Sequence, residues 1–367
     1  MKVAFRVDAS LQIGTGHVMR CLTLADVLRE VGAQCHFVCR EHPGNLIELI
    51  RQRGFSVNAL PASSRTHIDN EQMVEGQSIH ANWLGADWTT DAEQTKVGVG
   101  ETAVDWLIVD HYALDARWEH TLRPVCHQLM VIDDLADRPH DCDLLLDQNL
   151  GRFRDDYVRL VPTRCQILLG PNYALLRPEF AALRDESLRR RTVPQFDHLL
   201  ITMGGVDQSD ATGRILEALK HCQLPEALRI TVVMGPHAPW LENVKAIAKQ
   251  ISQVTTVVVN TEDIAKLMAE SDLAIGAAGS TSWERCCLGL PTLLVVVAEN
   301  QRNSASALEK LGCIKQFSLD VSSSRLNAII RDVGAPEELA KLSQKSCLVT
   351  DGHGATRVRD TMSASYA

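Results

Sequence analysis

The stretch MKVAFRVDASLQIGTGHVMRCLTLADVLREV, residues 1–31, determines the fold of the first half of the chain. Val3–Val7 has the apolar composition of a buried strand, and Val18–Val31 has the spacing of a helix. The glycine-containing turn Ile13–His17 joins them. A strand that leads through a turn into a helix predicts a parallel sheet, in which ligands bind beyond the carboxyl ends of the strands.

The same order of apolar run, polar turn and amphipathic stretch recurs along the whole chain, and it predicts two successive doubly wound α/β domains. The strands expected in the first domain are Val3–Val7, Gln34–Cys39, Ser56–Leu60, Trp106–Val109, Leu129–Ile132, Asp143–Leu146 and Gln166–Leu169. The strands expected in the second domain are His198–Thr202, Arg229–Met234, Thr256–Val259, Leu273–Ile275, Thr292–Val297 and Ile314–Phe317.

The length of 367 residues fits two domains of about 150 residues each. The expected parts are a first domain at 1–183 with a polar helical insertion at 63–101, a linker at 184–195, a second domain at 196–335, and a helical segment at 336–367 that packs back on the first domain. We expect helices near Ile79–Leu84 and Asp91–Val97 within the insertion. The run Arg189–Arg191 suggests either an anion site or a solvated linker, and we favour the linker.

Composition excludes several classes of protein. The net charge of -9, with both signs intermixed, argues against a nucleic-acid partner, which would require a basic patch. No segment approaches the roughly 20 apolar residues that span a bilayer. Because Met1–Asp8 lacks the apolar region of a signal peptide, we expect a cytoplasmic protein without membrane attachment. We further expect a monomer.

The eleven cysteines are scattered and form no Cys-x-x-Cys pair. Cys35, Cys39 and His42 suggest a metal site, but Cys35, Phe37 and Cys39 alternate along one face of an expected strand. We therefore favour a core role for these cysteines. We predict neither a metal nor a cofactor.

The first glycine turn is the strongest candidate for chemistry. Gly14, Thr15 and Gly16 allow close approach of a ligand to the backbone, and a helix N-terminus presents amides to an anion. The turn lacks both the third glycine of a dinucleotide fingerprint and the Gly-Lys-Ser/Thr of a Walker loop. His17 lies in the first helical turn, where the helix dipole favours the neutral imidazole that can accept a proton. Packing or capping at the helix start is the alternative.

Asp8 has two interpretations. At the end of the first strand it either orients His17 or binds a substrate amide, or it forms a buried ion pair with Arg6, two residues earlier on the same strand face. We include both Asp8 and Arg6 among the candidate site residues.

A second small-residue turn lies in GAAGSTSWERCCLGLP, residues 276–291. The turn at Gly279, Ser280 and Thr281 opens a helix and suits a diphosphate that rests on backbone amides. Glu284, one turn into that helix, is suited to accept hydrogen bonds from a ribose. A tight strand–helix turn with a favourable acidic residue is the alternative. Gly204 and Gly205 form a further glycine turn that is a candidate for enclosing the diphosphate.

With these segments placed, the chain resembles the GT-B glycosyltransferase-like superfamily. Within it, the chain more closely resembles the UDP-sugar hydrolases of pseudaminic acid biosynthesis, which act on UDP-2,4-diacetamido-2,4,6-trideoxy-β-L-altropyranose. The matching segments, in order, are Arg6–Cys21, Ile108–Asp115, Asp133–Asn149, Gly170–Phe180, Met203–Asp207, Ala277–Glu284 and Glu299–Gln301. The resemblance covers nearly the whole chain, although the polar insertion before Asp105 is longer than in the most compact members and a fused acetyltransferase domain is lacking.

The resemblance implies two Rossmann-like domains that face each other across a cleft. It also implies metal-independent, inverting cleavage between the anomeric carbon and the diphosphate oxygen by water. It gives the role of base to His17 and substrate contacts to Tyr112, Glu284 and Asn300, with Gln301 beside the last of these. Tyr112 is expected to contact either the sugar or the attacking water.

Two other functions remain as alternatives. A glycosyltransferase of the same fold would move the sugar of a UDP-aminosugar to an acceptor. A non-catalytic nucleotide-sugar binding protein would need the Glu284 pocket but no histidine in the first glycine turn.

Overall fold

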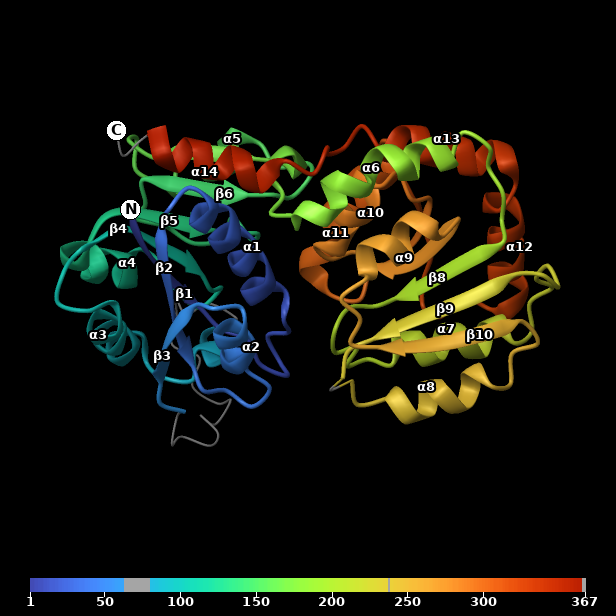
Figure 1. Cartoon of the computed structure of the whole chain (residues 1–367), viewed down its shortest axis with the longest axis horizontal. Helices are drawn as coiled ribbons and strands as arrows, with labels where there is room; N and C mark the ends of the chain where they lie inside the picture. The colour runs from blue at the N-terminus through green and yellow to red at the C-terminus, as the bar shows by residue number, and fades with distance from the viewer. Residues whose placement is uncertain (63–79, 237, 365–367) are drawn as a thin grey trace. The chain divides into compact units, whose positions relative to one another are not determined.

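The computed structural model describes residues 1–62, 80–236 and 238–364. It divides the chain into two compact units: unit 1 comprises Met1–Leu175 with Ala355–Ala367, and unit 2 comprises Leu176–Gly354. Each unit is a parallel sheet covered by helices on both faces (Figure 1). Each expected strand is found, and none is displaced by more than three residues at either end.

The sheet of unit 1 has seven parallel strands in the order β3-β2-β1-β4-β5-β6-β7. Its central strands are buried on both faces, which explains why they are continuous apolar runs in the sequence rather than alternating ones. The strands are β1 (Lys2–Val7), β2 (Gln34–Arg40), β3 (Ser56–Leu60), β4 (Val104–Asp110), β5 (Cys126–Ile132), β6 (Leu144–Asp147) and β7 (Gln166–Leu169).

Two apolar cores hold the helices of unit 1 against this sheet. One core contains residues of α1, α2 and α14, and the other contains residues of α3, α4 and α5. The helices are α1 (Gly16–Glu30), α2 (Ile47–Gln52), α3 (Trp88–Val99), α4 (Ala116–Leu122), α5 (Arg154–Tyr157) and α14 (Gly354–Ala364), with the 3₁₀ helices η1 (Ala81–Leu84), η2 (Arg123–Val125) and η3 (Pro171–Tyr173).

The sheet of unit 2 has six parallel strands in the order β10-β9-β8-β11-β12-β13. The strands are β8 (His198–Thr202), β9 (Arg229–Met234), β10 (Val254–Val259), β11 (Leu273–Ala277), β12 (Thr292–Val295) and β13 (Lys315–Gln316). One core packs α7, α8, α12 and α13 on this sheet, while α6 contacts both α9 and α10. The helices are α6 (Pro178–Arg190), α7 (Ala211–Leu219), α8 (Leu241–Ala248), α9 (Ile264–Glu270), α10 (Thr281–Cys287), α11 (Arg302–Lys310), α12 (Ser323–Val333) and α13 (Pro336–Ser346), with the 3₁₀ helix η4 (Glu299–Gln301).

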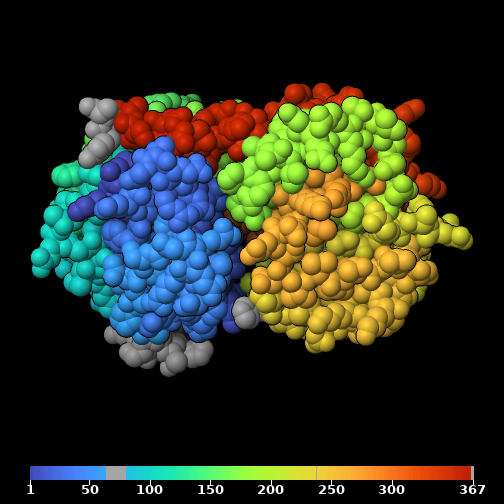
Figure 2. Space-filling view, viewed as in Figure 1, coloured from blue at the N-terminus to red at the C-terminus, as the bar shows by residue number. Residues whose placement is uncertain are grey.

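The segment expected as a solvated linker, 184–195, is instead largely helical and packed into unit 2, because its arginines satisfy buried carbonyl groups. Arg184 Nη2 donates to the carbonyl of Cys347 at 2.7 Å. Arg191 is buried and donates to the carbonyls of Ser271 at 2.8 Å and Leu288 at 3.0 Å. The interpretation of Arg189–Arg191 as a solvated run is therefore wrong for Arg191. In the space-filling view, α6 in yellow-green lies beside α13 in red (Figure 2).

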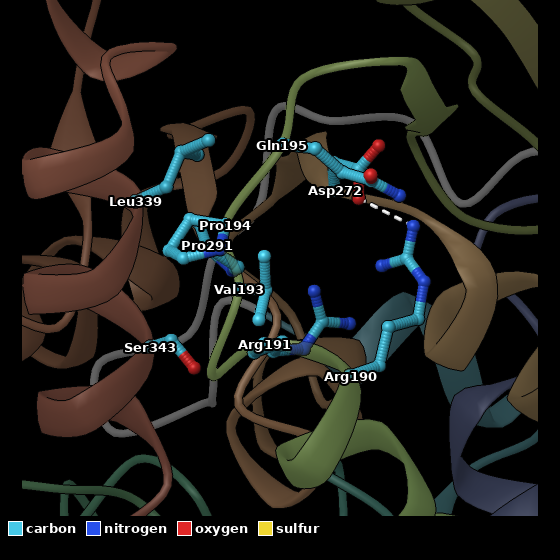
Figure 3. Close-up of a pocket in the computed structure, with 9 residues that line it drawn as sticks. All are labelled: Arg190, Arg191, Val193, Pro194, Gln195, Asp272, Pro291, Leu339 and Ser343. Carbon is cyan, nitrogen blue, oxygen red and sulfur yellow. Dashed lines mark hydrogen bonds and ion pairs between the residues drawn. The ribbon is translucent and has the colours of Figure 1, made fainter.

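A shallow pocket lies at the end of α6. Figure 3 shows Arg190 paired with Asp272, whose carboxylate lies 2.5 Å from Nη2 of Arg190. Asp272 also accepts the backbone amides of Asp197 and His198 at 2.9 Å each. The charged groups around this pocket are thus occupied in holding α6 to the start of β8.

The C-terminal segment is not one continuous piece. Helix α13 belongs to unit 2, and only α14 returns to unit 1, where Ala355, Val358 and Met362 enter the apolar core. Arg357 Nη1 adds a hydrogen bond of 2.9 Å to the carbonyl of Asn172. The expected return of the chain is therefore made by α14 alone.

The expected insertion at 63–101 includes residues 63–79, which lie outside the described residues. Among the described residues, the helix expected near Ile79–Leu84 is found as η1, and the helix expected near Asp91–Val97 is α3. Helix α3 contacts β2, β3 and α4 and contributes Ala92 and Val99 to a core of unit 1. It therefore belongs to the helical layer over the sheet. Within the described residues, no helix is long and apolar enough to cross a bilayer.

Candidate active site

Polar side chains gather at the carboxyl edge of the sheet in unit 1. Asp8 follows β1, Asp110 ends β4, and Asp134 follows β5. The parallel register pairs Val7 with Asp110, so the end of β4 lies directly beside the end of β1. These side chains therefore lie at the edge of the parallel sheet where a ligand is expected to bind.

The loop from Ser10 to Gly16 sets the start of helix α1 and thereby the position of His17. The Ser10 hydroxyl accepts the backbone amide of Ile13 at 2.9 Å, and the amide of Gly14 donates to the Ser10 carbonyl at 2.8 Å. Gly14 has a φ of 82°, a conformation that glycine adopts without a steric cost. Thr15, at the N-cap, makes no side-chain capping bond, and the first turn contains no acidic residue.

His17 is bound through one ring nitrogen to a buried carboxylate. Its Nδ1 lies 2.6 Å from Oδ1 of Asp110, and only 10% of its side chain is exposed. Arg20, one helical turn further, donates from Nε to Oδ2 of Asp110 at 2.6 Å and from Nη2 to Oδ1 at 2.7 Å. Burial opposes ionisation of Asp110, but the charge of Arg20, together with the hydrogen bonds from Arg20 and His17, outweighs it and holds the pKa of this carboxyl well below its usual range.

Tyr112 packs on the ring of His17 and belongs to the same network. The two rings meet edge to face, with centroids 4.6 Å apart. The Tyr112 hydroxyl donates to Oδ2 of Asp134 at 2.7 Å, and Nη1 of Arg20 lies 2.7 Å from the same oxygen. Trp83 of η1 stacks on Tyr112 at 5.6 Å between centroids. Burial, together with the charge of Asp134, raises the pKa of the Tyr112 hydroxyl well above its ordinary value.

Asp8 forms the ion pair that was one of its two interpretations. Its Oδ1 lies 2.7 Å from Nη1 of Arg6, and neither side chain has exposed surface. Arg6 also donates to Asp91 at 2.6 Å, and Nη2 of Arg40 donates to the same carboxylate at 2.6 Å. Trp118 Nε1 completes the shell of Asp91 at 3.0 Å. Asp8 therefore does not orient His17, and Arg6 supports the sheet from within rather than presenting a donor to a ligand.

Two histidines lie on the other side of Asp8. Its Oδ2 is 3.4 Å from Nε2 of His111 and 3.6 Å from Nε2 of His42. Burial lowers the pKa of His111 although Asp8 acts in the opposite direction. Among residues 1–62, 80–236 and 238–364, no group of three or more His, Cys, Asp or Glu side chains is arranged to hold a metal. Cys39 is buried in the apolar core and Cys35 packs against it, as their place on the strand predicted.

In unit 2 the second small-residue turn is built over a buried arginine. Arg285 Nη2 donates to the carbonyl of Ala277 at 2.7 Å and to the hydroxyl of Ser282 at 3.1 Å, and its Nη1 donates to the hydroxyl of Thr281 at 3.1 Å. A Cβ at Gly276 would lie 2.4 Å from Nη1 of Arg285, so this position needs glycine unless the arginine moves. Burial lowers the pKa of Arg285 to about 10. The turn at 277–280 is thus held from below by a cation.

The remaining candidate residues of this turn lie along α10 and η4. Glu284 is half-buried, and burial raises the pKa of its carboxyl although Arg177 acts in the opposite direction. Asn300 is exposed on η4. Gln301 accepts the backbone amide of Val297 at 3.0 Å, and its Nε2 lies 4.0 Å from the position that a Cβ of Gly279 would occupy. Gly279 and Gln301 are therefore neighbours, as candidates for one binding site should be.

The glycine turn after β8 carries a different helix cap. Gly204 has a φ of 96°, and a Cβ at Gly235, after β9, would lie 1.9 Å from the carbonyl oxygen of Gly205. Asp207 accepts the amides of Ala211 and Thr212 at 2.9 and 2.8 Å. These two amides of α7 are therefore occupied by Asp207 and do not face a ligand in this conformation.

The structure adds Asp110, Arg20 and Asp134 to the candidate site. Asp110 directly follows the expected strand Trp106–Val109, but the sequence pattern assigned it no role. The three-residue spacing of His17 and Arg20 places both side chains on one face of α1, and this spacing is the one sequence signal from which a shared partner could have been inferred. The contact of Trp83 with Tyr112 has no comparable signal, because η1 follows a long segment of low periodicity.

The class of protein follows from the two parallel sheets and from the comparisons with known proteins. The model of the glycosyltransferase family 28 C-terminal domain matches residues 198–358, nearly all of unit 2 and the start of α14. MurG of Acinetobacter baumannii has 17% identity and a TM-score of 0.67, with 99% of each chain covered. WaaG, a glycosyltransferase involved in lipopolysaccharide biosynthesis, has 16% identity and a TM-score of 0.54, covering 98% of this chain and 99% of that one. The chain has a two-domain GT-B fold.

Among proteins of this fold, the chain is also similar in sequence to a UDP-sugar hydrolase. The UDP-2,4-diacetamido-2,4,6-trideoxy-beta-L-altropyranose hydrolase of Campylobacter jejuni is 28% identical over 312 residues, which are 85% of this chain and 97% of that protein. The resemblance inferred from the sequence segments is therefore confirmed.

Proposed function

We propose that this protein hydrolyses UDP-2,4-diacetamido-2,4,6-trideoxy-β-L-altropyranose, or a closely related nucleotide-linked sugar, to the free sugar and UDP. The similarity to the Campylobacter hydrolase extends over both units and supports the substrate class. The hydrogen bonding of His17 is the observation that supports hydrolysis with a general base. Its Nδ1 is bound inside the protein, while its Nε2 makes no hydrogen bond with the described residues.

In the proposed mechanism, Nε2 of His17 takes a proton from water, and the water oxygen attacks the anomeric carbon. The bond from that carbon to the diphosphate oxygen breaks, and its electron pair leaves with UDP. Attack opposite to the leaving group inverts the anomeric configuration. A general base of this kind contributes roughly 10²–10⁴ in rate. Tyr112, which packs on the His17 ring, limits the orientations that the imidazole can adopt.

Unit 2 is proposed to bind the UDP part of the substrate. Backbone amides of the turn at Gly279–Thr281 would receive the diphosphate, and Glu284 would accept from the ribose hydroxyls. Arg285 beneath the turn adds positive charge near the leaving group, where negative charge develops. Asn300 and Gln301 are proposed as further substrate contacts, and we propose that no metal takes part.

The test is release of UDP from the UDP-sugar by the purified protein, with no acceptor and with a chelator present. Proton NMR of the fresh product gives its anomeric configuration. We expect release of UDP with inversion, unaffected by the chelator. Intact UDP-sugar after prolonged incubation would contradict the proposal. Turnover that appears only after addition of a sugar or lipid acceptor would instead indicate a glycosyltransferase.

A further inference from the structure

We propose that Asp110 is the positioning residue of the base: with Arg20 it holds His17 as the tautomer that carries its proton on Nδ1 and leaves Nε2 to accept one. This inference rests on the proposed function, because it assigns to Asp110 a task in the same reaction. It concerns a residue that lies behind the imidazole.

The position of the proton follows from the contacts of Nδ1. Oδ1 of Asp110 lies 2.6 Å from this nitrogen, whereas Nη2 of Arg20 lies 3.4 Å from it. A lone pair on Nδ1 would face an ionised carboxylate oxygen within hydrogen-bond distance, which is repulsive. A proton on Nδ1 turns the same contact into a short charge-assisted hydrogen bond. The neutral imidazole then has its lone pair on Nε2.

Arg20 keeps the Asp110 carboxylate both ionised and fixed. It donates to both oxygens of Asp110 from a planar guanidinium, so the carboxylate cannot rotate without losing a hydrogen bond. Asp110 has no exposed surface, and water does not compete for these oxygens. The carboxylate is therefore oriented before a substrate arrives, as an effective catalytic support must be.

The charges around Arg20 favour proton uptake by His17. Arg20 pairs with two carboxylates, those of Asp110 and Asp134, and their sum with the guanidinium is one net negative charge. When His17 accepts the proton of water, its imidazolium cancels that charge at a distance of 2.6 Å from Asp110. The developing cation is thus stabilised without movement of any group.

The experiment combines activity with a direct observation of the tautomer. Two-bond nitrogen–proton correlation NMR on protein labelled with ¹⁵N-histidine distinguishes a protonated ring nitrogen from an unprotonated one. The spectrum of His17→Ala identifies the His17 signals among those of the 13 histidines. In the wild-type protein at mildly alkaline pH, we expect a proton on Nδ1 and none on Nε2. A wild-type spectrum with the proton on Nε2 overturns the proposal, and this measurement needs neither a substrate nor a folded Asp110 variant.

Asp110→Asn is the variant that tests the consequence. Its amide group cannot accept from His17 and from both donors of Arg20 at once, so we expect kcat to fall by at least about a hundredfold. We also expect the His17 signals to lose the pure Nδ1–H pattern, while UDP affinity is unchanged. An unaltered kcat in a folded Asp110→Asn protein overturns the proposal.

Asp115→Asn is the matched control. Asp115 lies five residues after Asp110 and also pairs with an arginine, Arg117. This control should leave both kcat and the His17 spectrum unchanged. If the wild-type protein releases no UDP, the proposed function fails, but the wild-type tautomer still decides whether Asp110 positions His17.

Discussion

The carboxyl edges of the two sheets differ in chemistry although they share one architecture. In unit 1, the edge is a network of buried charges in which Asp110 and Asp8 each have an arginine partner and a neighbouring histidine. In unit 2, the turn after β11 presents small residues and backbone, with Arg285 buried beneath it. The first edge is suited to hold a titratable side chain in one state, and the second is suited to receive an anion.

Several carboxyl groups of unit 1 have lowered pKa values, whereas two carboxyl groups of unit 2 have raised ones. Arginine partners hold the pKa of Asp8, Asp91 and Asp110 low in unit 1 although burial opposes this. In unit 2, the pKa values of Asp210 and Glu284 are raised, chiefly by burial. The comparison indicates that arginine pairs fix the geometry of these carboxylates in unit 1, whereas Glu284 of unit 2 makes no such ion pair with the described residues.

The largest expected effect on activity comes from replacement of His17, the side chain that Asp110 and Arg20 hold in unit 1. His17→Ala should lower kcat by roughly 10²–10⁴, because the base is lost, while UDP affinity stays the same. UDP release and isothermal titration calorimetry with UDP measure the two quantities. His120→Ala is the control. This histidine of α4 has 83% of its side chain exposed, so its replacement should change neither kcat nor UDP affinity. Retained turnover in His17→Ala would remove His17 from the role of base.

The second effect concerns the stability of the unit 1 edge. Asp91→Asn leaves the buried side chains of Arg6 and Arg40 without their shared carboxylate, and removal of one partner of a buried ion pair costs about 3–5 kcal/mol. We expect a loss of this size in the free energy of unfolding, measured by urea titration. Glu93→Gln on the same helix breaks only an exposed pair with Lys96 and should cost at most about 1 kcal/mol. Equal losses in the two variants would show that the buried network is not what stabilises this edge.

The third prediction tests the proposed UDP-binding turn of unit 2. Glu284→Ala should weaken UDP binding by about tenfold or more, because hydrogen bonds to a charged group contribute roughly 1.5–3 kcal/mol. Calorimetric titration with UDP measures this change. Glu242→Ala, at a site with 84% of the side chain exposed, is the control and should bind UDP normally. Unchanged UDP affinity in Glu284→Ala would argue against a ribose contact.

The smallest effect is a difference in acid sensitivity. A carboxyl whose folded pKa is depressed, such as Asp8 or Asp110, stabilises the fold fully above its unfolded value of about 3.9, and this contribution is lost as the pH falls through the folded pKa. Raised pKa values, as for Asp210 and Glu284, have the opposite sign: those groups favour the folded state more as the pH falls. Below about pH 4, unit 1 should therefore open before unit 2.

Hydrogen–deuterium exchange, resolved by peptide, measures this order of opening. Within unit 1, Asp147 acts against the trend, because burial and the nearby Asp134 raise the pKa of its carboxyl to about 7. Its protonation between neutral pH and pH 4 favours the folded state, so the loss of protection in unit 1 should be confined to more acidic solution. Earlier exchange in unit 2 would contradict the assignment of stabilising ion pairs to unit 1.

The two parallel sheets could be predicted from the sequence alone, and so could the edge of each sheet at which a ligand would bind. Buried parallel strands are continuous apolar runs, and the helices between them have a clear period, so both signals are local. The glycine turn before His17 and the turn at Gly279 are also local signals, because positive φ values and close backbone approach limit which residues can occupy such turns.

The pairing of side chains could be learned only from the three-dimensional structure. Asp8 pairs with Arg6 rather than His17 because α3, more than 80 residues later, brings Asp91 to the same buried guanidinium. Asp110 became the partner of His17 because β4 lies beside β1 in the sheet. Arg191 is buried because α6 packs onto the carbonyls of unit 2. Pairings of this kind depend on which elements meet in space, and local sequence patterns do not carry that information.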